Sequence, residues 1–390
     1  MLGPVAGFLI TFQPVFRGAA LRELRAVDPQ AAVVAQLDPA AALVRPSGSA
    51  AEFAGRLLAA APVFIRHAAP ADLEVDLAGA EDPMAALIAA FDPAGRIAPG
   101  STFAVEARRL HAGGEGLPFG ARDVEVRLGT CLAERGYEVD MAAPDRVVSV
   151  ALHGWRALIG VSAPSENLAA HADEYRRYSR WLRPVSRAEV KLREALEVWP
   201  LALTAGGRAL DVGAAPGGWT HVLAELGLHV TAVDPGDLSE QVLASPLVTH
   251  VRARLEAAEL EPGSFDLLVN DMNLDPDESA ALMCEAASRL APGAPAIMTI
   301  KVTVRSPLRL IRGTLAVLQH AYEVRAVRSL FHNRQEVTVL LRRRATIAPG
   351  WEALVGHDPE ASARRRSWRL EHQLDPDDGA IPLVLRREAS

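Results

Sequence analysis

The chain contains only two lysines, Lys191 and Lys301, although 41 of its 390 residues are lysine or arginine. This imbalance indicates a composition that uses arginine wherever a positive charge alone is sufficient. Arginine cannot lose its proton near neutral pH, whereas a lysine can when it is desolvated or lies beside another cation. We therefore predict that the two lysines are needed as amines; the alternative is that they remain by drift.

Two acidic residues, Asp271 and Glu336, are placed in the sequence so that they could lie close to these lysines. Asp271 ends the apolar segment FDLLVND and Lys301 ends APAIMTIK, while Lys191 lies on a predicted helix and Glu336 opens the segment EVTVLLRR. In an open α/β sheet the reacting groups gather at the carboxyl ends of the strands. An Asp or Lys at a strand end is usually structural or solvated, but both lysines of the chain fall in this set. We therefore predict a catalytic group of Lys191, Asp271, Lys301 and Glu336.

One reaction that such a group could assist is attack by a ribose 2′-hydroxyl on a methyl donor. The hydroxyl is a weak nucleophile, so its proton must be drawn off as the methyl group moves. A lysine near a second cation has a lowered pKa and can serve as the base. Asp271 could hold that ammonium, Lys191 could stabilise the forming alkoxide, and Glu336 could position a lysine or the ribose. Holding the reactants in line would contribute most, about 7–11 kcal/mol.

A glycine-rich turn from Asp211 to Trp219 joins a predicted buried strand to a predicted helix. Glycines at such a turn allow a ligand to pack against bare main chain. The second glycine of a dinucleotide-binding fingerprint is replaced here by Ala215, and Pro216 follows it. The turn therefore suits a nucleoside with an amino-acid tail better than a pyrophosphate. Asp234, at the end of the next strand, could accept hydrogen bonds from ribose hydroxyls. The alternative for the glycine-rich turn is an ordinary tight connection between a strand and a helix.

The elements that must position these residues form two groups. From residue 187 onward, strands alternate with helices, which predicts a doubly wound parallel sheet with helices on both faces. Upstream, an α+β region ends in a strand pair that turns at His153 and Gly154. The predicted helices are 18–27, 49–61, 81–93, 121–136, 187–199, 217–227, 276–290 and 306–320, and the predicted strands are 7–16, 62–70, 101–110, 146–162, 208–213, 229–234, 265–272, 294–301, 323–331 and 336–343.

Composition excludes several classes of protein. No run of about 18 uncharged apolar residues is present, and the opening segment does not resemble a signal peptide, so we expect neither a membrane span nor export. The two cysteines, Cys131 and Cys284, suggest neither a disulfide framework nor a metal site. A cytoplasmic location is therefore expected, with no obligate protein partner evident.

The net charge and the distribution of basic residues point in opposite directions on whether the protein binds nucleic acid. The formal net charge of −7 argues mildly against one. Basic runs at 176–193, 342–344 and 364–369 argue in favour, although such runs are more often solvated faces. The polar, arginine-rich residues 164–185 are predicted to form a linker that could lie along a ligand.

The segments SRAEVKLREAL, LDVGAAPGGWTHVL, VNDM, IKV and LFHNRQEVTVLLRR resemble the FtsJ-type 2′-O-methyltransferases, whose mark is a Lys-Asp-Lys-Glu tetrad around a DxGAxPGGW loop. Within that family they are most similar to the branch that methylates a cytidine ribose of bacterial large-subunit 23S rRNA. The resemblance covers about residues 186–344. Residues 102–163 are more weakly similar to a THUMP RNA-binding module, and the opening FQPVFRGAALRELRA resembles the ferredoxin-like piece that precedes it.

The resemblance implies a Rossmann-like S-adenosylmethionine-dependent RNA methyltransferase with 23S rRNA or its precursor as partner. It assigns Lys191, Asp271, Lys301 and Glu336 to the tetrad, with Lys301 as general base. It implies five regions: a ferredoxin-like domain (1–70), a THUMP-like domain (71–165), a basic linker (166–185), the methyltransferase domain (186–345) and a C-terminal extension (346–390). It assigns cofactor binding to Asp211, Gly213, Ala214, Pro216, Gly217, Gly218, Trp219, Asp234 and Asp271.

Several points stay open at this stage. Family members often carry an acidic residue near the adenine after the third strand, where this chain has Arg254 and, two positions later, Glu256. A tRNA substrate is an alternative to rRNA. A non-catalytic RNA-binding protein with the same fold is another, although the complete tetrad disfavours it. An NAD-linked oxidoreductase is disfavoured by the AAPGGW loop.

Overall fold

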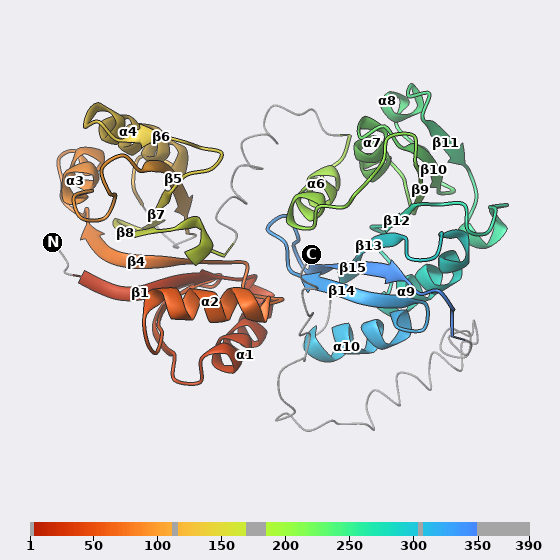
Figure 1. Cartoon of the computed structure of the whole chain (residues 1–390), viewed down its shortest axis with the longest axis horizontal. Coiled ribbons are helices and arrows are strands. Elements are labelled where there is room, and N and C mark those ends of the chain that lie inside the picture. The colour runs from red at the N-terminus through yellow and green to blue at the C-terminus, as the bar shows by residue number, and fades with distance from the viewer. Residues whose placement is uncertain (1–3, 111–115, 169–184, 303–306, 349–390) are drawn as a thin grey trace. The chain divides into compact units, whose positions relative to one another are not determined.

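The computed structural model describes residues 4–110, 116–168, 185–302 and 307–348. The chain divides into two compact units, Met1–Glu174 and Tyr175–Ser390, and each is described separately (Figure 1).

The first unit is built on one eight-stranded sheet with the strand order β2-β3-β1-β4-β8-β7-β5-β6. Its strands are β1 (Pro4–Thr11), β2 (Ala32–Asp38), β3 (Ala41–Arg45), β4 (His67–Asp76), β5 (Thr102–Arg109), β6 (Glu138–Val139), β7 (Arg146–His153) and β8 (Arg156–Ser162), and its helices are α1 (Arg17–Val27), α2 (Ala50–Ala60), α3 (Pro83–Ala90) and α4 (Ala121–Glu134). Helices α3 and α4 bury apolar side chains against β5, β7 and β8. The predicted strand pair around His153 and Gly154 is confirmed as β7 and β8.

The predicted strand at 62–70 begins only at His67. The backbone amides of Val63, Phe64 and Ile65 donate to the carboxylate of Glu23 at 2.7–3.2 Å instead of to a neighbouring strand. Strand β4 then runs through residue 70, where we placed a domain boundary, and the sheet is continuous on both sides of it. A division of this region into ferredoxin-like and THUMP-like parts therefore stays a prediction.

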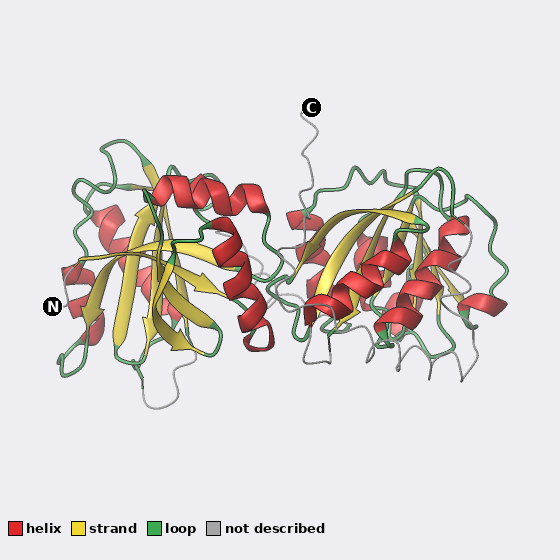
Figure 2. Ribbon diagram, turned by 90° about the horizontal axis from the view of Figure 1, so that it is seen from below, coloured by secondary structure: helices red, strands yellow, loops and turns green. Residues whose placement is uncertain are grey.

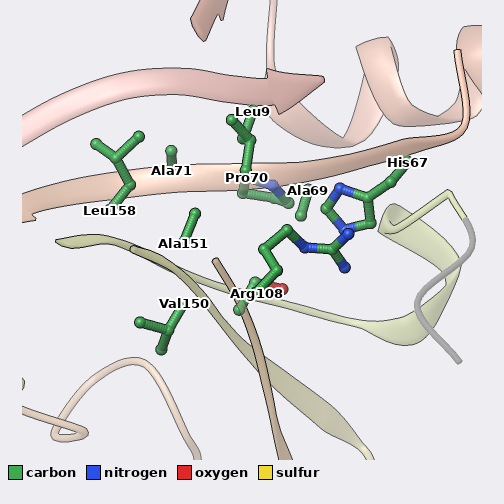
Figure 3. A pocket seen from close by; sticks show the side chains of 10 residues that line it. Leu9, His67, Ala69, Pro70, Ala71, Arg108, Val150, Ala151 and Leu158 are labelled. Carbon is green, nitrogen blue, oxygen red and sulfur yellow. The ribbon is translucent and has the colours of Figure 1, made fainter. Parts of the chain in front are cut away.

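A small cavity lies in this sheet, with His67 of β4 facing Arg108 of β5 across it (Figure 3). Burial, and then the charge of Arg108, hold the pKa of His67 well below its ordinary value, so the ring is neutral. The cavity has room for about one water molecule. A nucleoside would not fit, so we do not assign a substrate site there.

The second unit is a seven-stranded sheet with the order β11-β10-β9-β12-β13-β15-β14. Helices cover both of its faces (Figure 2). Its strands are β9 (Arg208–Val212), β10 (His229–Val233), β11 (Val248–Val251), β12 (Leu267–Asn270), β13 (Pro295–Lys301), β14 (Tyr322–Arg328) and β15 (Glu336–Arg343), and its helices are α6 (Glu189–Val198), α7 (Gly218–Glu225), α8 (Glu240–Leu243), α9 (Pro276–Ala286) and α10 (Pro307–Leu318). Helices α6 and α7 share a core with β9, β10 and β12. The predicted α/β methyltransferase-type sheet is confirmed.

One strand departs from the predicted parallel arrangement. β15 lies between β13 and β14 and is antiparallel to both. Because β15 runs the opposite way, its first residue lies at the edge where β12 and β13 end. Glu336 is thereby paired directly with Lys301.

Candidate active site

Three of the four predicted catalytic residues lie at one edge of the second sheet. Lys301 is the last residue of β13, Glu336 is the first of β15, and Asp271 follows the last residue of β12. Lys191 reaches them from the first turn of α6. The structure thus brings together all four residues that the sequence grouped.

The four side chains form a closed arrangement in which positive and negative groups alternate. Lys191 Nζ lies 2.5 Å from Asp271 Oδ2 and 3.1 Å from Glu336 Oε1. Lys301 Nζ lies 2.7 Å from Asp271 Oδ1 and 2.5 Å from Glu336 Oε2. Each ammonium therefore joins both carboxylates, and the formal charge of the group is zero. The side chains are only 8–15% exposed, so these charge-assisted contacts are poorly screened by solvent.

The electrostatics correct one expectation. Burial alone would lower the pKa of Lys301, but the carboxylates of Asp271 and Glu336 outweigh it and raise that pKa above its ordinary value. Burial would likewise raise the pKa of Asp271, but Lys301 and Lys191 hold it below its ordinary value. We had expected the neighbouring cation to dominate and to lower the lysine pKa. In this state the two carboxylates outweigh both burial and the neighbouring cation, so Lys301 carries a proton.

Two polar residues that sequence reasoning missed support the carboxylates. Thr299 Oγ1 donates to Asp271 Oδ1 at 2.6 Å. The buried Asn333 places its Nδ2 3.5 Å from Glu336 Oε1, and its Oδ1 accepts from the amide of Leu330. Thr299 precedes Lys301 by two positions and so lies on the same face of β13, which the sequence could have indicated. Asn333 is in a loop, and no local pattern marks it.

The glycine turn lies at the same edge of the sheet. Gly213 has φ +75°, and a Cβ atom added there would lie 1.9 Å from Cγ of Met272, the residue after Asp271. Gly217 has φ +106°, and an added Cβ would lie 2.8 Å from a methyl of Val242. At Gly218 an added Cβ would lie 2.1 Å from Ser186 Oγ. At all three glycines neighbouring protein atoms fill the space of the missing Cβ, and Gly213 lies directly against the segment that carries Asp271.

Asp234 follows β10, as predicted, and is half-buried. Its carboxylate accepts from the amide of Ala215 at 3.1 Å and from that of Gly236 at 2.6 Å. It therefore fixes the turn itself. Each carboxylate oxygen can accept more than one hydrogen bond, so the ribose contact predicted for Asp234 stays a prediction.

Asp211 and Trp219 lie beneath the turn. Asp211 is 1% exposed and accepts from Thr220 Oγ1 at 2.6 Å, and its burial raises its pKa to about 7. Trp219 is 3% exposed and donates its indole N–H to the carbonyl of Ala188 at 2.8 Å, just before α6. The structure gives both residues a supporting role, and a direct cofactor contact is untested for each. Ala214 is also buried, whereas Pro216 is exposed and follows a cis peptide bond.

The predicted basic runs differ in what the structure says of them. Arg342, Arg343 and Arg344 donate to backbone carbonyls, including those of Gly293 and Ala287, so they brace the sheet. Arg187 is exposed, whereas residues 176–184 and 364–369 lie outside the described residues. Arg254 and Glu256 are both exposed, and the adenine contact stays open. Among the described residues, no helix has the length and apolar character to cross a membrane.

Replacing Gly213 by Ala should destabilise the protein more than the same change at Gly206. Both glycines have positive φ, but an added Cβ at Gly206 meets no atom within 4 Å. Gly206→Ala should therefore cost only the backbone term, about 1–2 kcal/mol, and Gly213→Ala should cost more because of Met272. Urea unfolding measures both, and Met272→Ala should recover part of the Gly213→Ala loss. Equal losses without recovery would contradict the close approach.

Asp211→Asn should change how stability depends on pH. Because the folded-state pKa is raised above the ordinary 3.8 to about 7, the folded protein holds the Asp211 proton where the unfolded chain has lost it. Between about pH 4 and 7, each pH unit should therefore destabilise the wild type relative to the variant by up to about 1.4 kcal/mol, levelling off above pH 7. Urea unfolding of both proteins at pH 5, 6, 7 and 8 measures this difference; parallel curves would show that Asp211 ionises normally.

The second unit matches known methyltransferases in sequence. The family model described as FtsJ-like methyltransferase matches residues 184–362. The chain is 31% identical over 245 residues to Ribosomal RNA large subunit methyltransferase M of Azotobacter vinelandii, covering 59% of this chain and 68% of that one. It is 36% identical over 171 residues to the protein of the same name from Alteromonas mediterranea, covering 40% and 46%. In that match the chain spans about half of the relative's length.

Among solved structures, the crystal structure of TrmN from Thermus thermophilus is 22% identical, with 87% of this chain and all of that chain covered and a TM-score of 0.35. The matched relatives and the family model together show that the chain belongs to the FtsJ-like methyltransferases, in the family of Ribosomal RNA large subunit methyltransferase M.

Proposed function

We propose that this protein transfers a methyl group from S-adenosylmethionine to a ribose 2′-hydroxyl of RNA, and that its substrate is a cytidine of 23S rRNA. The observation that carries this proposal is the alternating group of Lys191, Asp271, Lys301 and Glu336 beside the glycine turn. The names of the relatives support a large-subunit rRNA substrate. An RNA partner and a cytoplasmic location follow from the same argument.

The residues of the turn fit the proposed cofactor. The missing side chains of Gly213, Gly217 and Gly218 leave room for neighbouring protein atoms to pack against the turn, which holds its main chain in a tight loop beside the segment of Asp271. Asp234, held by two amides of the loop, would offer its remaining lone pairs to the ribose hydroxyls. When bound, S-adenosylmethionine supplies an electrophilic methyl group on a sulfonium cation.

The tetrad would hold the hydroxyl and take its proton. Methyl transfer forms a bond between the 2′-oxygen and the methyl carbon, breaks the sulfur–carbon bond and releases one proton. Lys301 is protonated in the state described here, so it can act as base only after it loses that proton. A cation placed beside the tetrad lowers a lysine pKa, which the sulfonium would do. We therefore retain Lys301 as general base and assign Asp271 to its orientation.

The substrate is tested by incubating the purified chain with deproteinised rRNA and tRNA pools and labelled S-adenosylmethionine. We expect label in 23S rRNA as a single 2′-O-methyl ribose, located by mapping the modified nucleotide. Label only in tRNA would replace the substrate part of the proposal. Absence of label in either pool, with calorimetry showing that S-adenosylmethionine binds, would favour a non-catalytic RNA-binding protein.

Lys301→Arg should lower kcat by about 10²- to 10⁴-fold, because arginine keeps the charge but cannot accept the proton. Lys191→Arg should lose less, since Lys191 is not assigned as the base, although a planar guanidinium bridges Asp271 and Glu336 less well than an ammonium. Steady-state methylation of the identified RNA measures kcat of both variants, with S-adenosylmethionine affinity by calorimetry as the folding control. Wild-type kcat should rise with pH as the base loses its proton. A Lys301→Arg enzyme of near-normal rate would remove Lys301 as base.

A further inference from the structure

Lys191 differs from the other three tetrad residues in how it is held. Lys301 ends β13, Glu336 begins β15 and Asp271 directly follows β12. The spacing of these adjacent strands is fixed by the sheet. Lys191 is carried by α6, a helix of ten residues outside the sheet. The position of its ammonium therefore depends on how this short helix is held against the strand ends.

Glu194 lies three positions after Lys191 on α6, so the two side chains lie on the same face of the helix. Its side chain is buried, with only 3% of the residue exposed. A buried carboxylate is costly unless hydrogen bonds compensate it. Glu194 Oε1 accepts from the amide of Phe331 at 2.6 Å, and Oε2 accepts from the amide and Nδ1 of His332, both at 2.8 Å. The carboxylate is thus satisfied by the loop between β14 and β15, which lies beside α6 (Figure 1).

The same loop holds Glu336. Asn333, 1% exposed, accepts from the amide of Leu330 at 2.7 Å and from Thr338 Oγ1 at 3.1 Å, and its Nδ2 faces Glu336 Oε1. Glu336 Oε1 is also the oxygen that contacts Lys191. The loop therefore touches α6 at one end and a tetrad carboxylate at the other.

These contacts connect α6 to the same segment of chain at two points. Glu194 binds the amides of Phe331 and His332 in the loop, and Lys191 binds Glu336, which directly follows the loop. A shift of the helix along the sheet edge would break the Glu194 bonds and the Lys191 contacts together. Glu194 therefore does more than fill space in the core, because its carboxylate binds the loop that leads into Glu336.

We propose that Glu194 is a positioning residue of the active site, which fixes α6 against the β14–β15 loop so that Lys191 reaches both Asp271 and Glu336. Glu194 does not touch the reactants in this proposal. The inference rests on the proposed function for its kinetic consequence, but the geometry of Lys191 can be measured without any activity.

The presence of only two lysines in the chain makes that measurement direct. A protein labelled with ¹³C-lysine gives two sets of side-chain signals in an NMR spectrum, assigned with Lys191→Arg and Lys301→Arg. In Glu194→Gln we expect the Lys191 signal to shift by more than the Lys301 signal, because Lys301 is held by β13 and feels the change only through the two carboxylates that it shares with Lys191. We expect kcat to fall by up to about 100-fold, as for a misplacement near 1 Å, with the KM for S-adenosylmethionine unchanged.

Glu225→Gln is the matched control. Glu225 also pairs with α6, through Arg193, but on an exposed side of the helix. Its loss should leave both lysine signals and kcat as in the wild type. His332→Ala removes the Nδ1 contact and the edge contact of the ring with Phe331 but keeps both backbone bonds to Glu194. It should therefore be milder than Glu194→Gln and shift the Lys191 signal in the same direction by less.

An unshifted Lys191 signal in folded Glu194→Gln and in His332→Ala would overturn the proposal, whether or not kcat falls. A shift as large in Glu225→Gln would also overturn it, because any contact to α6 would then suffice. If the wild type methylates no RNA, the proposed function fails, while the lysine spectra still decide whether Glu194 positions Lys191.

Discussion

The arrangement of two ammonium groups and two carboxylates at the edge of the second sheet depends on all four charges being present. Each lysine contacts both acids within 3.1 Å, and the side chains are at most 15% exposed. Removing one partner from such a group leaves an uncompensated charge away from water, which costs several kcal/mol. The fold must therefore deliver four side chains from four separate elements to one place.

The antiparallel direction of β15 brings one of the two carboxylates, that of Glu336, to the edge where Asp271 and Lys301 lie. Asp271 and Lys301 lie at the carboxyl ends of parallel strands, where reacting groups are expected. A further parallel strand would have placed Glu336, its first residue, at the opposite edge of the sheet. Because β15 is antiparallel, its amino end lies beside the last residue of β13, and the loop before it can also reach α6. One reversed strand thus supplies both a tetrad carboxylate and the attachment for the helix that carries Lys191.

The sequence was sufficient to predict the four tetrad residues, the glycine turn and nearly all helices and strands of the second unit. Those features leave local marks: rare lysines, glycines at a turn, and apolar periodicity. The direction of β15, the binding of Glu194 to Phe331 and His332, and the burial of Trp219 against Ala188 leave no local mark. They depend on which segments become neighbours. The raised pKa of Lys301 was missed for the same reason, since it follows from distances to two carboxylates and not from the count of nearby cations.

The structure also changes the reason why lysine is retained at these two positions. The sequence argument rested on the ability of an amine to lose its proton, yet Lys301 holds its proton here. A second reason applies even to the protonated form. An ammonium is a compact charge with three donors that can point in different directions, whereas the guanidinium of arginine is a flat fork. Bridging Asp271 and Glu336 from one atom suits the ammonium. Arg342, Arg343 and Arg344, by contrast, donate to backbone carbonyls in the connections beside the sheet, a task for which the longer, planar group is well shaped.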